Sequence, residues 1–130
     1  MIQEEFVTLE TAKLLKEKGF KEDVFTFYEV DCVEGDMILS ETYNESENFN
    51  EKNDCLSAPT QSLAQKWLRE TKNIHICVYN CACGYGYEIS KADNGTHITS
   101  SVYEGPNDGG EWDIYKDALE AGLQEALKLI

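Results

Sequence analysis

The side chains best suited to chemistry are gathered in residues 73–90, which read NIHICVYNCACGYGYEIS. This stretch holds His75 and three of the five cysteines of the chain, Cys77, Cys81 and Cys83. Imidazole and thiolate are the ligands that zinc prefers, and a thiolate is also a strong nucleophile. The stretch therefore raises two possibilities: a metal or thiol site, or a β-strand with one face lined by cysteine.

The spacing of these residues favours the strand. In an extended chain one face carries His75, Cys77, Tyr79, Cys81 and Cys83, and the other carries Ile74, Ile76 and Val78. Same-face neighbours on a strand stand roughly 6.5–7 Å apart, whereas sulfurs bound to one zinc ion approach within roughly 4 Å. We therefore expect free thiols that are buried or half-buried and line the interior.

A metal site survives only if residues 82–86 form a sharp knuckle that brings Cys81 and Cys83 together. Cys77, His75, His97 or Cys55 would then have to complete the tetrahedral ligand set. The paired CxxC repeat of a structural zinc site is absent from the sequence. We expect no metal and no cofactor. A zinc or thiol site at Cys77, Cys81 and Cys83 stays as the lesser alternative.

No catalytic constellation stands out elsewhere. No nucleophile motif surrounds any cysteine, and GYGYE lacks the lysine and the following helix of a phosphate-binding loop. The carboxylates are abundant, but none is flanked in a way that marks a general acid. We therefore predict that the protein is not an enzyme and has no catalytic residues.

Two loops carry aromatic side chains in acidic company and are candidate binding segments. Residues 41–54, ETYNESENFNEKND, contain Tyr43 and Phe49 in what we expect to be a long exposed acidic loop over 41–56. In residues 104–113, Trp112 stands between Glu111 and Asp113. The alternative is that the first two aromatics fold back on the core, and that Trp112 anchors the last helix to the sheet.

A second function class uses a pocket between the sheet and Trp112. A small anionic ligand, such as a nucleotide, would need cationic or imidazole donors there. The candidates expected near the sheet are Arg69, Lys72, His75 and His97.

Charge restricts the possible partners. The net charge is −14, and Arg69 is the only arginine. Phosphate backbones are bound by Lys and Arg, so we expect no nucleic-acid binding and instead expect a protein partner with a basic surface. The acidic N-terminal sequence lacks the pattern of a secretory signal, and no apolar run is long enough to span a membrane, so a cytoplasmic location is predicted. Exposed strand edges also leave a homodimer possible.

The elements that must position these residues form an α+β pattern in one domain, 1–130. A helix is expected after Thr8, ending near Gly19, followed by a strand from Asp23 and a hairpin at residues 34–36. Ser57 is the expected N-cap of a second helix that ends near Thr71, and Asp113 that of a last helix. Strands over 73–103 complete the order α-β-β-α-β-β-β-α, an antiparallel sheet of about five strands with helices packed on one face.

Three segments, APTQSLAQKWLRE, NIHI and ALEAGLQEALKLI, resemble small uncharacterised proteins encoded by phages, prophages and mobile elements of gut Bacteroidota. The resemblance covers residues 57–79 and 115–130 well. It implies no established activity, and no functional residue carries over. It does imply a cytoplasmic setting rich in small acidic proteins that bind host machinery. The leading hypothesis is thus a non-enzymatic accessory or counter-defence factor that binds a host protein.

Overall fold

The computed structural model describes residues 1–31 and 33–130, and Cys32 lies outside the described residues. The chain divides into two compact units, Met1–Ser62 and Leu63–Ile130. The described residues form three α-helices and six strands in the order α-β-β-β-α-β-β-β-α. The α+β class is confirmed. The single sheet of about five strands is wrong, because the strands form two separate three-stranded antiparallel sheets.

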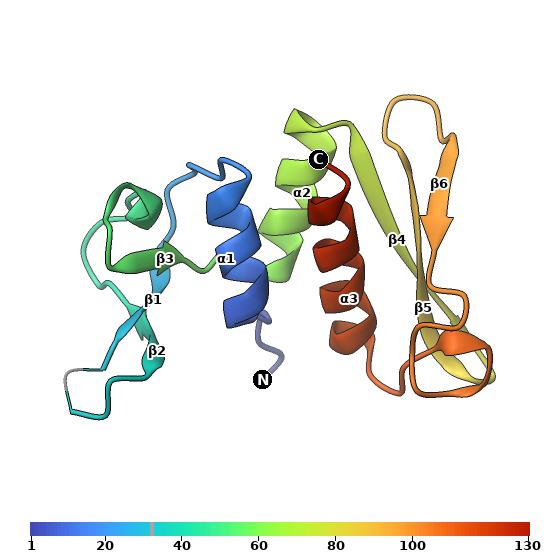
Figure 1. The fold of residues 1–130 in the computed structure, drawn as a ribbon, viewed down its shortest axis with the longest axis horizontal. Coiled ribbons are helices and arrows are strands. Elements are labelled where there is room, and N and C mark those ends of the chain that lie inside the picture. Colours follow the sequence, from blue (N-terminus) through green and yellow to red (C-terminus); the bar gives the residue numbers. More distant parts are fainter. Residues whose placement is uncertain (32) are drawn as a thin grey trace. The chain divides into compact units, whose positions relative to one another are not determined.

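The first unit begins with α1, Leu9–Glu17, whose N-cap Thr8 accepts a hydrogen bond from the Thr11 amide through its hydroxyl oxygen. Its sheet has the order β2-β1-β3, formed by β1 (Thr26–Val30), β2 (Met37–Glu41) and β3 (Cys55–Ser57) (Figure 1). The expected hairpin joins β1 to β2, and Gly35 takes the positive φ of +77° that its turn requires. A short 3₁₀ helix, η1 (Phe49–Glu51), precedes β3.

The strand β3 corrects the expected start of the second helix. Ser57 pairs with Phe27 of β1, and its amide donates to the side chain of Asn50, so it belongs to the sheet and is not an N-cap. The helix α2 begins only at Gln61 and runs to Thr71. Three residues of pairing with β1 thus override a plausible local capping signal.

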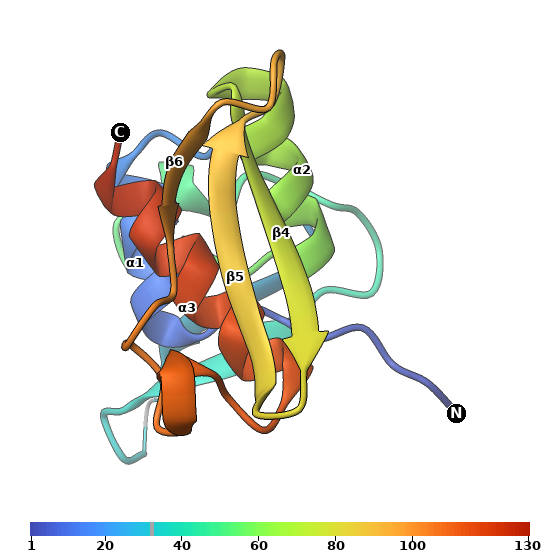
Figure 2. The same ribbon diagram turned by 90° about the vertical axis from the view of Figure 1, so that its right-hand side faces the viewer.

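The second unit carries the sheet β4-β5-β6, formed by β4 (Ile74–Cys81), β5 (Gly84–Lys91) and β6 (His97–Ser100). A loop with a short 3₁₀ helix, η2 (Asp108–Gly110), leads to α3 (Tyr115–Lys128). In Figure 2 the sheet faces the viewer and α3 runs behind it. The predicted cap of this last helix is wrong: Ile114 is the N-cap, and the Asp113 carboxylate accepts instead from the Asn107 side-chain amide at 2.7 Å.

The helix α3 packs on β4 and β5 and closes one face of that sheet. Side chains of Ile76, Tyr87 and Ile89 on this face are at most 1% exposed. Gly122 permits the close approach, because a Cβ there would lie 3.0 Å from Ile76 and 3.2 Å from Tyr87. Within the described residues, no helix combines the length and the apolar character needed to cross a membrane.

Candidate functional site

The β1–β2 hairpin, residues 26–41, exposes apolar side chains on both of its faces. Val30 is 49% exposed, Ile38 40%, Leu39 45%, and Val33 in the turn 91%. Ile38 pairs with Glu29 and Leu39 with Tyr28, so the two neighbours project to opposite faces of the sheet. An edge strand normally keeps one polar face, and a cluster of exposed apolar side chains is typical of a surface that binds another protein.

The segment that contains these apolar side chains is strongly acidic and has no cation. Between Lys21 and Lys52 the chain has no Lys, Arg or His, and it contains ten acidic residues: Glu22, Asp23, Glu29, Asp31, Glu34, Asp36, Glu41, Glu45, Glu47 and Glu51. Those nearest the apolar cluster, Glu34, Asp36 and Glu41, are exposed. An apolar centre with a polar rim is the usual anatomy of a protein interface.

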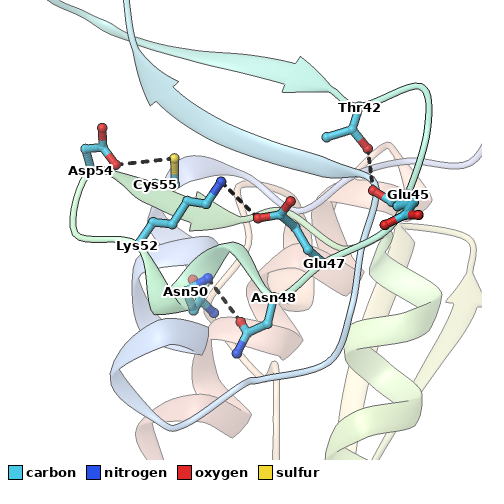
Figure 3. A network of polar contacts seen from close by, with 8 residues as sticks. All are labelled: Thr42, Glu45, Glu47, Asn48, Asn50, Lys52, Asp54 and Cys55. Carbon is cyan, nitrogen blue, oxygen red and sulfur yellow. Dashed lines mark hydrogen bonds and ion pairs between the residues drawn. The ribbon is translucent and has the colours of Figure 1, made fainter.

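Polar contacts hold the segment that follows the hairpin, residues 42–54. Some join residues of the segment to one another (Figure 3), and others join it to the rest of the first unit. Glu47 exchanges two backbone hydrogen bonds with Val24, at 3.0 and 3.1 Å. The Asn50 side chain donates to the Phe20 carbonyl and accepts from the Ser57 amide. Thr42 bonds the Glu45 carbonyl. The predicted long loop over 41–56 therefore includes the end of β2, η1 and most of β3.

The two aromatic residues predicted in this segment lie in different environments. Phe49 is 2% exposed and stacks on Phe27 with ring centroids 4.1 Å apart, so for Phe49 the alternative of folding back on the core is confirmed. Tyr43 is 92% exposed and is the second residue after the end of β2. Tyr43 is thus accessible to a partner, whereas Phe49 belongs to the core.

The lysine of this segment does not neutralise the hairpin. Lys52 forms an ion pair with Glu47 at 2.9 Å, and this hydrogen bond and charge raise the pKa of the lysine. Nearby, burial and the neighbouring Asp54 raise the pKa of the Cys55 thiol, which lowers its reactivity at neutral pH.

In the second unit the structure reverses the predicted burial of the cysteines. Ile74 and Ile76 face α3 and are buried, while Cys77 and Cys81 point to the opposite side and are exposed, as is Cys83 in the turn. The expectation that these thiols line the interior is wrong. The alternation of side chains between the two faces of β4 was correctly predicted. The choice of the buried face was wrong, because both faces carry apolar residues and α3 covers the face with the isoleucines.

The loop candidates in the second unit hold the sheet to the start of α3. Trp112 forms two backbone hydrogen bonds with Tyr85, at 2.7 and 2.8 Å, and its ring stacks against Tyr87. This confirms the alternative in which Trp112 anchors the last helix to the sheet. Glu111 is 8% exposed, and one of its oxygens lies 3.4 Å from the Tyr79 hydroxyl, which donates to it. Asp113 is exposed and bonded to Asn107.

The predicted donors for an anionic ligand do not gather around Trp112. His75 and His97 both pair with Ser90 and lie on the open face of the sheet, whereas Trp112 stacks on Tyr87 of the face covered by α3. His97 lies 3.3 Å from the Glu88 carboxylate on that open face. Arg69 is a half-buried residue of α2, and Lys72 lies over the Trp67 ring. The sheet itself separates the two histidines from the tryptophan.

Among residues 1–31 and 33–130, no group of three or more His, Cys, Asp or Glu side chains is placed to hold a metal ion. Comparison of the chain with protein-family models, with curated proteins and with solved structures finds no match. The functional inference therefore rests on the geometry of the described residues.

Sequence reasoning missed the apolar part of the hairpin. A usable signal was present: Met37, Ile38 and Leu39 are consecutive apolar residues in a short strand next to a turn. Consecutive apolar residues place apolar side chains on both faces, which suits a strand that is covered on both sides. In the described structure Ile38 is 40% and Leu39 45% exposed, so neither side chain is fully covered.

Proposed function

We propose that the protein is a non-enzymatic binding protein that docks a partner protein with a basic surface, and that the β1–β2 hairpin is its docking surface. The observation that carries the proposal is the exposure of Val30, Val33, Ile38 and Leu39 on the two faces of one hairpin, inside a cation-free acidic segment. Apolar burial would supply affinity, and the acidic rim would speed association and exclude acidic competitors.

The resemblance to phage and mobile-element proteins suggests the setting of this interaction. The proposed partner is a host protein in the bacterial cytoplasm, and the protein would act as an accessory or counter-defence factor. Nucleic acid is a poor ligand for this surface, because the hairpin offers no cation to a phosphate backbone.

Affinity measurements on hairpin variants test the proposal. A protein retained from host lysate at low salt is identified, and its dissociation constant is measured for the wild type, Leu39→Ser, and the double variant Glu34→Lys with Glu41→Lys. We expect each hairpin variant to weaken binding about tenfold or more, since each removes part of the apolar centre or reverses the rim. The loss in the double variant should shrink as salt rises.

The matched control reverses two acidic residues outside the hairpin but in the same unit. Glu10 and Glu17 on α1 are exposed, and Glu10→Lys with Glu17→Lys makes the same change in net charge. This control should change affinity less than about threefold. If it weakens binding as much as the hairpin variants do, or if lysates of several hosts yield no partner, the hairpin is not a docking surface. Sedimentation of the pure protein shows whether the occupant is a second copy, which would contradict a basic host partner.

A further inference from the structure

The outer strand of the β1–β2 hairpin, β2, has a neighbouring strand on one side only, because the sheet order is β2-β1-β3. Backbone groups of an antiparallel strand point alternately towards its neighbour and away from it. Just beyond the end of β2, the Thr42 amide donates to the Phe25 carbonyl at 2.8 Å, which sets the phase of this alternation. Ser40 and Ile38 share that phase and bond to β1. The residues whose N–H and C=O groups point outward are therefore Met37, Leu39 and Glu41.

Side chains cover the outward groups of β3, the other edge strand of this sheet. Lys16 donates to the Cys55 carbonyl at 3.0 Å, and the Asn50 side chain accepts from the Ser57 amide at 2.9 Å. In the described structure the outward groups of β2 have no such partner. The strand also contains no proline or lysine, and its register with β1 is free of bulges. An edge without these protections is a template for pairing with another strand.

The side chains beside this edge indicate what kind of partner fits it. On one face of the sheet Leu39 is followed by Glu41, and on the other face Ile38 lies opposite Glu29. Each face thus presents an apolar side chain near a carboxylate. The side chains of an added strand alternate between the two faces, so such a strand contacts both sets. A partner surface pressed against one face would contact only one of them.

Charge distinguishes a basic strand from a second copy of this chain. In an antiparallel pair of two β2 strands centred on Leu39, each copy would bring its own Glu41 and a net charge of −14 to the contact. Like charges of this size oppose association. A strand with lysine or arginine instead forms opposite-charge pairs across the new ladder, and the aliphatic stems of these residues cover Leu39 and Ile38.

We propose that the free edge of β2, Met37–Glu41, binds an extended segment of the partner protein as an added β-strand, and that this segment carries lysine or arginine among apolar residues. The proposal rests on the docking function proposed above and specifies its mode. Backbone hydrogen bonds to Met37, Leu39 and Glu41 supply affinity, and the side chains on the two faces supply selectivity.

Amide hydrogen exchange of the full chain, followed by NMR, tests strand addition. The probe is a short peptide with blocked ends in which lysine and valine alternate, at millimolar concentration. The outward amides of Met37 and Leu39 should exchange at least about tenfold more slowly when the peptide is bound, because they become bonded to it. A peptide with glutamate in place of lysine is the charge control and should give no protection.

The edge strand β4 provides the matched control within the same protein. Ile76 directs its carbonyl outward to the Gln65 side chain at 2.7 Å, so the amide of Val78 also points outward. This strand, Ile74–Cys81, carries no acidic residue. The lysine–valine peptide should therefore leave the exchange rate of the Val78 amide unchanged.

Two changes of the backbone separate strand addition from side-chain contact. Leu39→Pro removes an outward N–H and no bond to β1, and an edge strand tolerates proline in this orientation. It should weaken peptide binding about tenfold or more, whereas Leu39→Val keeps the N–H and should weaken it less than about threefold. The same peptide with every amide N-methylated should also bind at least about tenfold more weakly to the wild type. That comparison requires no variant to fold, and circular dichroism verifies that the two variants do.

The outcomes distinguish this proposal from the docking function. Strand addition is overturned, and docking is not, if the methylated peptide shifts the hairpin signals with the affinity of its parent, or if Leu39→Pro binds like Leu39→Val. Both are contradicted if the lysine–valine peptide shifts no signal of the hairpin. Equal protection of Val78 would show that the peptide adds to any free edge and would overturn the selectivity for β2. Protection of Met37 and Leu39 that grows with protein concentration in the absence of peptide would identify a second copy as the occupant.

Discussion

The two sheets of the protein are both three-stranded and antiparallel, yet they bury their edge strands differently. In β4 the covered face carries Ile76, 1% exposed, and the open face carries Cys77 and polar partners. In β2 the neighbours Ile38 and Leu39 point to opposite faces, and they are 40% and 45% exposed. Edge strands with the same local geometry thus have one covered apolar face in the second unit and partly exposed apolar residues on both faces in the first.

The difference shows that a covering helix, and not the alternation of side chains, decides which residues form a core. In the second unit α3 lies on β4 and β5, so apolar residues on that face contribute burial energy. The β1–β2 hairpin of the first unit leaves its apolar residues Val30, Val33, Ile38 and Leu39 between 40% and 91% exposed, so they contribute less burial energy. Under the docking proposal these side chains would contribute to binding instead.

The largest expected difference between the two units concerns their hairpin glycines. Gly84 and Gly35 both have positive φ, +122° and +77°, but a Cβ on Gly84 meets the Trp112 carbonyl oxygen at 2.2 Å, whereas around Gly35 nothing lies within 4 Å. We expect Gly84→Ala to lower the free energy of unfolding by about 3 kcal/mol or more. Gly35→Ala should cost only about 1 kcal/mol, the conformational penalty alone.

Chemical denaturation of both variants checks this pair. The effect of Gly35→Ala serves as the reference for positive φ without a steric clash. Equal losses in the two variants would show that a Cβ at position 84 meets no obstacle, and that Trp112 does not constrain the β4–β5 turn.

A smaller contrast is expected between two isoleucines of edge strands. Ile76→Ala removes a side chain packed against α3 and should cost about 2–4 kcal/mol, including the cavity that it leaves. Ile38→Ala should cost less than about 1 kcal/mol, because the native side chain stays 40% exposed. Urea unfolding curves measure both. A loss for Ile38→Ala as large as that for Ile76→Ala would mean that β2 is part of a core, and the docking proposal would lose its basis.

The sequence predicted best where signals were local. Three elements predicted from local signals are confirmed. The spacing of apolar residues predicts the last helix and the strand from Ile74, and a glycine predicts the turn at Gly35. The strand Cys55–Ser57 did not follow, because only pairing with distant β1 stabilises three residues in extended form. For the same reason one expected sheet became two: local patterns indicate strands but do not specify their partners.

For the candidate site residues, the sequence predicted which side chains share a face of a strand, but not which face is exposed to solvent. The period of two correctly placed Cys77 and Cys81 on one face and Ile74 and Ile76 on the other. Which face is covered depends on where α3 lies, and that is a long-range property. Phe49 shows the same limit, since it belongs to an acidic segment but reaches Phe27 of β1.

Among the variants of the second unit in these comparisons, the smallest expected loss of stability concerns Tyr87, which lies on the face of the second sheet that α3 covers. Its hydroxyl donates to the Glu104 carboxylate, while its ring is fully buried. Desolvation, the hydrogen bond to Glu104, and the charges of Glu104 and Glu125 raise its pKa far above the ordinary 10.0. Tyr87→Phe keeps the ring and removes one charge-assisted hydrogen bond. It should cost about 1–2 kcal/mol near neutral pH, because the exposed Glu104 regains water.

The pH dependence gives this prediction its sign. Tyr87 binds its proton more tightly in the folded state, so its contribution is complete below the unfolded pKa of about 10 and is lost as pH rises towards the higher folded value. Between about pH 10 and pH 11, the wild type should therefore lose stability faster than Tyr87→Phe, by up to about 1.4 kcal/mol per pH unit. Tyr43→Phe is the control: its side chain is 92% exposed in the open unit, so it should follow the wild-type curve. Parallel curves for the wild type and Tyr87→Phe would show that the phenol ionises as readily in the folded protein as in the unfolded chain, and that this face of the sheet is open to water as well.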